Sequence, residues 1–477
     1  MGKDNTKKKR KVKGSAGQLE IVHPNACGID IGSRTHYVAV RPDRDEESVR
    51  SFGCLTPDLH EMGRWLKECQ VDTVAVESTG VYWVPVAQVL ERYGIEVNVV
   101  DGSHVKNFSG RKTDVQDCEW IRQLHRFGLL RGGFRPKEQI RVLRSYWRQR
   151  AELVKCCSRS ILHMQKALEQ MNLQLHKVIS DISGVTGLRI IRAIVAGEHD
   201  PVKLAQMKHR LVKSGTETIA KALTGEYRSE HLFTLKQALE TYDFYQRQIE
   251  ECDKKTQQYL STLESKADPE ELKLKPRKKN KHRRRKNEPY FDLRAETYRI
   301  TGVDLTLING IDAKTAYTII SEIGIDVSAF PSERRFASWC ALCPNNRITG
   351  GKVRSTRTRR VQNRVAHALR LAAQSLHSSN TALGAYYRRM RGRLGPSKAI
   401  TATAHKLAVL VYRMLKHGED YVDKGAQYYE ERYKERALKN LRRRATVLGF
   451  SLVPLPETQP VSQNTNVHKP PLTGLVS

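Results

Sequence analysis

The chain has 477 residues, which is too long for one ordinary hydrophobic core and predicts two to four structural units. Lysine and arginine number 83 against 51 acidic residues, and the formal charge of +32 opposes compaction unless a polyanion neutralises it. Nucleic acid is the polyanion that fits this charge best. The sequence has no apolar run of about 18 residues, which argues against a membrane partner. It also has no signal-peptide core, which argues against secretion.

Residues 1–19 form a basic arm. The run Lys7–Lys13 resembles a nuclear import signal and is followed by a Gly-Ser-Ala-Gly spacer. It is interpreted as either an engineered import tag or a native basic arm, and it is set aside from fold reasoning. The nine cysteines are odd in number and irregularly spaced, which favours a reducing cytoplasm over a disulfide framework.

Residues 20–136 alternate short β-rich runs with helical patterns. The β-rich runs are Gly28–Ser33, Tyr37–Val40, Val71–Glu77 and Ile95–Val100, and the helical patterns lie near Asp58–Cys69 and Val84–Tyr93. Alternation of this kind predicts an α/β domain with a mostly parallel sheet.

Four acidic residues of this domain occupy the ends of its predicted elements. Asp30 and Glu77 each end a strand, and Asp114 and Asp117 lie three residues apart where a helix should begin. Strand ends of an α/β sheet converge on one edge, and an i, i+3 pair faces one side of a helix. Four hard oxygen donors without His or Cys suit magnesium or manganese, and two such ions clamp the oxygens of an in-line phosphoryl transfer. The alternative is a set of separate surface carboxylates, with Asp114 as a helix cap.

Residues 137–265 are predicted to form a coiled-coil region. Apolar residues alternate at spacings of three and four from Ile140 to Val178, only Arg150 breaks the seam, and residues 137 to 183 contain no proline or glycine. A weaker repeat runs from Leu232 to Leu263. We favour a contribution to oligomerisation; the alternative is an intramolecular helical hairpin.

The rest of the chain divides into three parts. Residues 266–290 are a basic linker in which nine of the thirteen residues Lys275–Asn287 are Lys or Arg, which favours contact with phosphates. Residues 291–425 are mainly helical and include a pattern around Gly310 that is typical of a helix-hairpin-helix. Residues 426–477 are predicted to be a basic helix, ending near Arg442–Arg444, and a disordered tail.

Several motifs together make a resemblance specific. Gly28–Arg34 (GIDIGSR) is similar to the first strand of RuvC-type Holliday-junction resolvases, which belong to the ribonuclease-H-like superfamily. Val76–Trp83 (VESTGVYW) and Gly110–Asp117 (GRKTDVQD) resemble the second and third signatures of DEDD-type insertion-sequence transposases. This is the "one-ten" family, and the longer chain resembles its "eleven-eleven" branch. The likeness continues through the coiled coil to Ala399–Lys406 (AITATAHK), over roughly residues 20 to 450.

The resemblance implies a RuvC-like DEDD domain over residues 20–136 and a C-terminal transposase domain over residues 291–425. It implies an RNA-guided DNA recombinase that excises and inserts a mobile element in a bacterial host, where the protein would lie in the cytoplasm or nucleoid. The implied partners are a bridge (seek) RNA, donor DNA and target DNA, which pair with that RNA. The implied assembly is a homo-oligomer, from a dimer to a tetramer.

The resemblance also implies a nucleophilic hydroxyl in Leu342–Lys352 (LCPNNRITGGK), where the family typically has serine and this chain has Thr349. Threonine keeps the hydroxyl, although its β-methyl group stiffens χ1. Ser355 and Thr356 are fallback candidates. The predicted phosphate ligands are Arg111, Lys112, Lys352, Arg354, Arg357 and Arg359.

Three other functions stay open at this point. A metal-dependent nuclease of the junction-resolvase type would hydrolyse strands and leave no protein–DNA adduct. A nucleic-acid-binding scaffold with an inactive acidic site would not cleave at all. A tyrosine recombinase ranks low because no convincing Arg-His-Arg-Tyr set is present.

Overall fold

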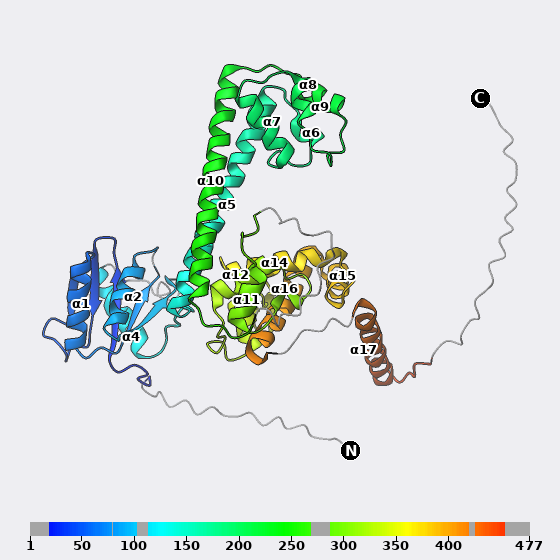
Figure 1. Ribbon diagram of the computed structural model, residues 1–477. Helices are drawn as coiled ribbons and strands as arrows, with labels where there is room; N and C mark the ends of the chain where they lie inside the picture. Colours follow the sequence, from blue (N-terminus) through cyan, green and yellow to red (C-terminus); the bar gives the residue numbers. More distant parts are fainter. Residues whose placement is uncertain (1–18, 79, 103–112, 269–286, 419–424, 454–477) are drawn as a thin grey trace, which may run out of the picture. The chain divides into compact units, whose positions relative to one another are not determined.

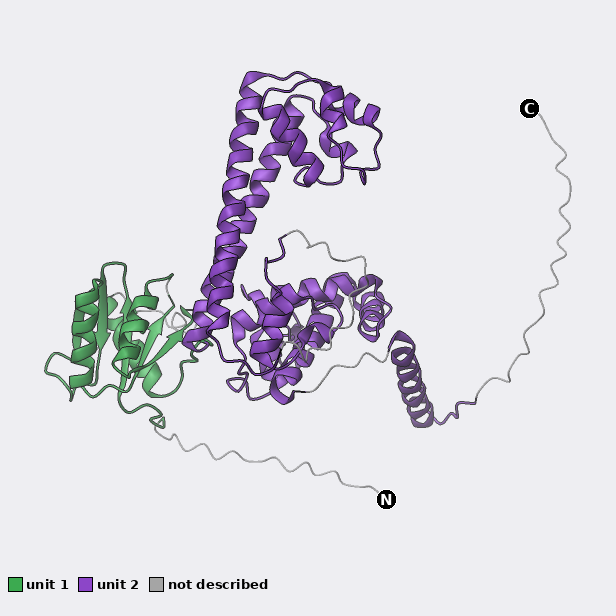
Figure 2. Cartoon of the chain, in the orientation of Figure 1, with its two compact units in different colours: residues 1–135 green, residues 136–477 purple. Residues whose placement is uncertain are grey.

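The computed structural model describes residues 19–78, 80–102, 113–268, 287–418 and 425–453 (Figure 1). The chain divides into two compact units, residues 1–135 and residues 136–477 (Figure 2). The import-signal-like run, residues 275–286 of the basic linker and the predicted tail beyond residue 453 lie outside the described residues. Among the helices that are described, none is both long and apolar enough to cross a bilayer.

The first unit contains a five-stranded mixed sheet. Its strands are β1 (Ala26–Ile31), β2 (Thr35–Ala39), β3 (Val49–Gly53), β4 (Thr73–Glu77) and β5 (Glu96–Val100), in the order β3-β2-β1-β4-β5. β1, β4 and β5 are parallel, whereas β2 pairs antiparallel with both β1 and β3. The prediction of a mostly parallel sheet is therefore corrected. The connections around β2 are too short for the crossover that a parallel pair requires.

Helices cover both faces of this sheet. They are α1 (Thr56–Glu68), α2 (Trp83–Arg92) and α4 (Asp114–Arg126). Ile29, Val74 and Val76 share a buried core with Leu66 of α1 and Leu90 of α2. On the other face, a smaller buried cluster joins Ala75 of β4 and Val100 of β5 to Ile121 of α4. Alternate residues of β4 thus face opposite helical layers, as the twofold period of a strand requires.

The second unit begins with an antiparallel helical hairpin, which we call the arm. It consists of α5 (Glu138–Gln170) and α10 (Ser229–Ser261), which lie side by side in Figure 1. Between them stand four shorter helices, α6 (Leu175–Val178), α7 (Val185–Val195), α8 (Pro201–Gln206) and α9 (Thr216–Leu223). The apolar seams of α5 and α10 bury each other, so the seam is intramolecular here. The expected role in oligomerisation stays a prediction.

The first arm helix is shorter than its apolar spacing predicts. α5 ends at Gln170, and Asn172 takes the left-handed φ of +58° that asparagine tolerates better than most residues. Met171, Leu175 and Val178 therefore do not extend the coiled coil. They pack instead into the core of the short helices around the turn.

Arg150 interrupts the seam because it has a buried partner on the other helix. Its guanidinium pairs with the Asp253 carboxylate, and both side chains are at most 2% exposed. Arg150 also donates to the Asn287 carbonyl oxygen at 3.2 Å and lies over the Trp147 ring. The pair joins α5 to α10 inside the buried seam.

The remainder of the second unit is a helical body that carries one β-hairpin. Its elements are α11 (Leu293–Thr301), η2 (Leu305–Leu307), α12 (Ala313–Ile323), α13 (Glu333–Trp339), β6 (Arg347–Thr349), β7 (Lys352–Ser355), α14 (Arg364–Ser375), η3 (Leu376–Ser378), α15 (Ala382–Leu394) and α16 (Pro396–His417), followed by α17 (Gly425–Val447). The predicted turn before α12 is present. Gly310 adopts φ +91° there, and a Cβ on it would lie 2.8 Å from the Ala372 carbonyl oxygen.

Candidate active site

Two parallel strands bring Asp30 and Glu77 to the same edge of the sheet. The register of β1 against β4 pairs Ile29 with Val76, so the next residue on each strand is one of the two acids. Glu77 is also the last residue of β4. The prediction that Glu77 ends its strand is confirmed, whereas β1 continues one residue past Asp30 to Ile31.

The other two predicted acids lie in the first turns of α4. Thr113 caps the helix by accepting a hydrogen bond from the Gln116 backbone N–H at 3.4 Å, so Asp114 is the first helical residue rather than the cap. Asp117 follows one turn later, on the same side of the helix. Acidic residues in the first turn interact favourably with the helix dipole.

A glycine on β1 determines how closely α4 approaches the sheet. A Cβ on Gly28 would lie 2.2 Å from the Cys118 carbonyl oxygen and 2.3 Å from the Arg122 backbone nitrogen. Only a residue without a side chain permits this packing. Gly28 therefore sets the position of the helix that carries Asp114 and Asp117, a role that the sequence reading missed.

We expect Gly28→Ala to reduce the free energy of unfolding of the first unit by about 1–3 kcal/mol, because α4 must move to admit the methyl group. Chemical denaturation of the full chain measures this change. Gly392→Ala is the matched control, since a Cβ at Gly392 would meet open space within α15. Equal stability of Gly28→Ala and the wild type would refute the packing argument.

The Asp30 carboxyl is affected by its own burial and by the charges of the other three acids. Burial is the largest cause that raises the pKa of the Asp30 carboxyl, and together with the negative charges of Asp114, Asp117 and Glu77 it brings this pKa to about 6. A carboxyl whose ionisation is opposed by three others lies in a pocket of negative potential. Asp30 is therefore close enough to Glu77, Asp114 and Asp117 for their charges to act on it, and their joint role as one catalytic site stays a prediction.

Among the residues that the structure describes, no three His, Cys, Asp or Glu side chains are placed to hold a metal ion together. The chemistry of Asp30, Glu77, Asp114 and Asp117 still fits a divalent cation. Their donor atoms are all carboxylate oxygens, and the charges of the other three acids raise the pKa of Asp30. Mutual repulsion of carboxylates is what a divalent cation relieves.

A glycine beside the Glu77 carboxylate was not predicted from the sequence. A Cβ on Gly102, two residues after β5, would lie 2.3 Å from the Glu77 Oε1 atom. Gly102 therefore leaves room for the Glu77 carboxylate. Sequence could have indicated it only through its position just after a strand that neighbours β4. Arg111 and Lys112, predicted as phosphate ligands near the acids, lie outside the described residues.

Thr349 is the last residue of β6 and lies at the tip of the β-hairpin. Gly350 and Gly351 follow it with φ values of +55° and +73°, and Thr349 pairs with Lys352 across the turn. Two successive left-handed residues form the tight turn that suits a two-residue hairpin. The Thr349 side chain is exposed, and it belongs to the second unit, whereas the four acids belong to the first.

The other predicted phosphate ligands surround the same hairpin. Lys352, Arg354, Arg357 and Arg359 are exposed. Arg359 donates through Nη2 to the Ser338 carbonyl oxygen at 2.5 Å, which ties the segment after β7 to α13. Ser355 Oγ accepts a hydrogen bond from the Arg357 backbone N–H at 3.3 Å, so this fallback hydroxyl has a structural use.

Two family models match the chain, one in each half. Residues 27–173 match the DEDD transposase model of the IS110 type, which spans all four acids. Residues 304–388 match the model of the transposase IS116/IS110/IS902 family, which spans the β-hairpin with Thr349. No curated protein matches the chain. With both of these domains in one chain, this protein belongs to the IS110 family of DEDD-type transposases and is a DNA transposase, an enzyme of DNA recombination.

Proposed function

We propose that this transposase is an RNA-guided DNA recombinase that excises and inserts a mobile element by metal-assisted strand cleavage and exchange. The observation that carries the proposal is the electrostatic coupling of Asp30 to Glu77, Asp114 and Asp117 at one edge of the sheet. A chain of this family that gathers four carboxyl groups in this way has the donor set for phosphodiester chemistry.

The acids of the first unit would hold magnesium or manganese. Bound by Asp30, Glu77, Asp114 and Asp117, such an ion supplies Lewis-acid stabilisation of the charge that develops on phosphate oxygens. We also propose a ribonuclease-H-like fold for this unit. The order β3-β2-β1-β4-β5, with an antiparallel β1-β2-β3 meander followed by two parallel strands, supports it.

Thr349 would be the nucleophile. Its Oγ1 loses its proton and attacks a phosphodiester, so that a new P–O bond joins the threonine to one strand end. The bond to the departing sugar oxygen breaks, and that oxygen takes up a proton, so no net proton is gained or lost. The hydroxyl of a second strand then attacks the phosphothreonine ester and restores the threonine. Exposure at the tip of a basic hairpin supports this role, since Lys352 and Arg354 can offset negative charge at the phosphate.

RNA guidance and an assembly from dimer to tetramer complete the proposal. The formal charge of +32 supports binding of more than one polyanion, because each neutralised phosphate releases a counterion. A guide RNA would supply the sequence specificity by pairing with donor and target DNA, so that the protein needs to recognise only backbone and shape.

Replacing Thr349 tests the nucleophile. We expect Thr349→Ala to eliminate any covalent protein–DNA adduct, because the attacking oxygen is gone, while RNA binding is retained. Thr349→Ser restores the hydroxyl without the β-methyl group and is expected to form the adduct at least as fast as the wild type. The measurement is the fraction of labelled DNA that stays with the protein on a denaturing gel.

The same gel separates the alternatives. An adduct that survives in Thr349→Ala but disappears in Thr356→Ala would move the nucleophile to that fallback residue. Cleavage by the wild type without any adduct would support the hydrolytic, junction-resolvase type of nuclease instead. The match of the second family model over the hairpin favours the recombinase.

A further inference from the structure

A cleft of about 480 Å³ lies in the second unit between α5, α12 and α14. Its apolar lining comes from two helices and consists of Trp147, Ala151, Val154, Ala368, Leu371 and Ala372. Leu371 is 54% exposed, so a large apolar side chain faces this open space. The volume is within the range of small-ligand sites.

Basic side chains outnumber acidic ones at the cleft, because Arg150, Lys314 and Arg364 line it together with Asp312 and Glu322, and Arg144 and Arg148 stand behind Glu322. The buried carboxylate of Glu322 meets three guanidinium groups, at 2.7 Å for Arg148, 3.3 Å for Arg144 and 3.9 Å for Arg364. One negative charge cannot neutralise three positive charges. Arg364 is half exposed and has the longest of these contacts, so it is the one most available to a further anion.

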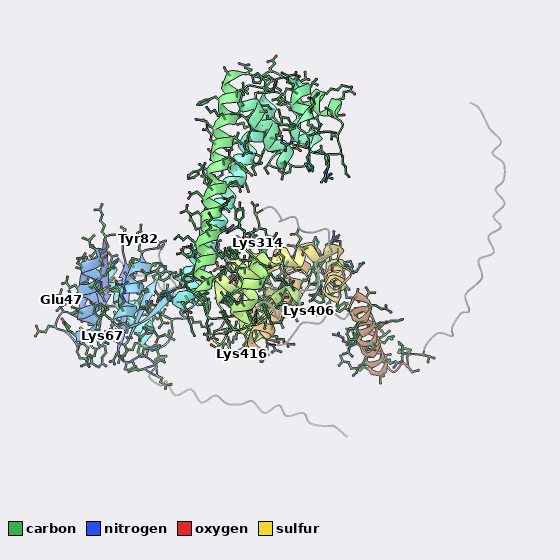
Figure 3. All side chains as sticks on the ribbon, in the orientation of Figure 1. Glu47, Lys67, Tyr82, Lys314, Lys406 and Lys416 are labelled. Carbon is green, nitrogen blue, oxygen red and sulfur yellow. The ribbon has the colours of Figure 1, made fainter. Side chains whose placement is uncertain are left out.

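Lys314 adds to this excess. It lies near the start of α12, on the side of the helical body next to the arm, and lines the cleft (Figure 3). Burial and the Arg150 charge lower the pKa of its ammonium group, and the Asp312 carboxylate acts in the opposite direction. Within the described part of the chain Lys314 forms no ion pair, and Arg150 is already neutralised by Asp253. Lys314 is exposed, so its charge is open to an anionic ligand at the cleft.

We propose that this cleft binds one unpaired nucleotide, with its base against Leu371 and Val154 and its phosphate at Lys314 and Arg364. An apolar wall beside unneutralised cations matches the two ends of a nucleotide. Proteins commonly take up unstacked bases on apolar or aromatic side chains. A base that is paired and stacked in a duplex cannot place its face against an apolar wall, whereas the base of an unpaired nucleotide can. The inference rests on the nucleic-acid partners proposed above and adds a site to them.

Photocrosslinking of the wild-type chain tests the site directly. One arm uses DNA with 4-thiothymidine at a single-nucleotide bulge, and the other uses RNA with 4-thiouridine at the same bulge. We expect crosslinked peptides that contain Val154 or Leu371 in at least one arm, and that arm identifies the source of the nucleotide. Crosslinks confined to other segments in both arms would overturn the proposal.

Affinity gives the second test. We expect the wild type to bind the bulged duplex about tenfold more tightly than a fully paired duplex of the same sequence. Leu371→Glu and Lys314→Gln should each remove most of this preference and leave the affinity for the paired duplex within about twofold. The controls are Leu394→Glu on α15, where the leucine is 40% exposed, and Lys416→Gln near the end of α16 (Figure 3); both should keep the preference.

The outcomes separate the two proposals. Equal binding of bulged and paired duplexes by the wild type would refute the nucleotide site alone. A wild-type chain that binds neither duplex nor RNA would refute the nucleic-acid function from which the site was inferred. If Leu371→Glu keeps the tenfold preference, the base does not lie against that wall, and the proposal fails.

Discussion

Asp30→Asn is expected to reduce DNA strand cleavage by on the order of 10³-fold while RNA binding changes little. The substitution removes a negative donor from the carboxylate group, and metal stabilisation of transition-state charge is worth several kcal/mol, each 1.36 kcal/mol being a factor of ten in rate. Cleavage of labelled DNA in magnesium and in manganese measures the loss. Undiminished cleavage would remove Asp30 from the proposed metal site.

The same variant has a second, independent readout in the absence of divalent ions. The pKa of Asp30 is raised from 3.8 to about 6, so the folded chain holds this proton more tightly than the unfolded chain. The stabilisation that results is fully present below pH 3.8 and is lost as the pH rises through about 6. At neutral pH Asp30→Asn should therefore be more stable than the wild type, by about 1 kcal/mol once the partial exposure of the group is discounted.

Thermal unfolding across this pH range measures the effect. The stability difference between Asp30→Asn and the wild type should shrink as the pH falls toward 4. Millimolar manganese should narrow it at neutral pH, because an ion bound only by the folded wild type stabilises that state. A difference that is independent of both pH and manganese would mean that the carboxyl groups do not interact as described.

Asp253→Asn is expected to have the largest effect on stability. It would leave the Arg150 cation almost fully buried without its counter-charge, since Arg150 and Asp253 are both at most 2% exposed in the seam of the arm. Breaking such a pair from one side costs about 3–5 kcal/mol. Urea denaturation of the full chain, followed by its helical circular dichroism signal, measures the shift.

Two further variants complete this experiment, one as a control and one as a test of the unpaired-charge explanation. Asp243→Asn on the same helix removes an exposed ion pair with Arg192, 2.7 Å long, and should cost less than about 1 kcal/mol. Replacing both partners, as Arg150→Met with Asp253→Leu, should recover most of the stability because no unpaired charge remains. A cost for Asp253→Asn no greater than that for Asp243→Asn would show that the pair does not hold the seam.

Sequence was sufficient for the features that depend on local pattern. The apolar runs around Asp30 and before Glu77 are neighbouring parallel strands, and the threonine before Asp114 caps the helix that carries it. The helices of the arm and of the C-terminal body also follow from apolar spacing. In each case neighbouring residues decide the structure, so reading the chain locally is enough.

The features that sequence missed depend on distant partners. Arg150 looked like a flaw in the repeat because Asp253 lies 103 residues further along the chain. The end of α5 at Gln170 had no Gly or Pro to announce it, and the apolar spacing continued past it. Gly28 is an ordinary strand residue until α4 lies against it. β3 was not predicted because Val49–Gly53 is only partly buried and shows little apolar alternation.

The arm has a geometrical consequence of its own. Its two helices have 33 residues each, so each is about 50 Å long at 1.5 Å per residue. Because the two helices are antiparallel, the end of α10 lies beside the start of α5. There Tyr259 Oη donates a hydrogen bond to the Gln139 carbonyl oxygen. Matched deletions of whole turns from both helices would therefore shorten the reach of the short helices at the far end without altering the chain path at the base. The arm is therefore a spacer. Its length can be changed, by natural or designed deletions, in steps of about 5.4 Å per helical turn.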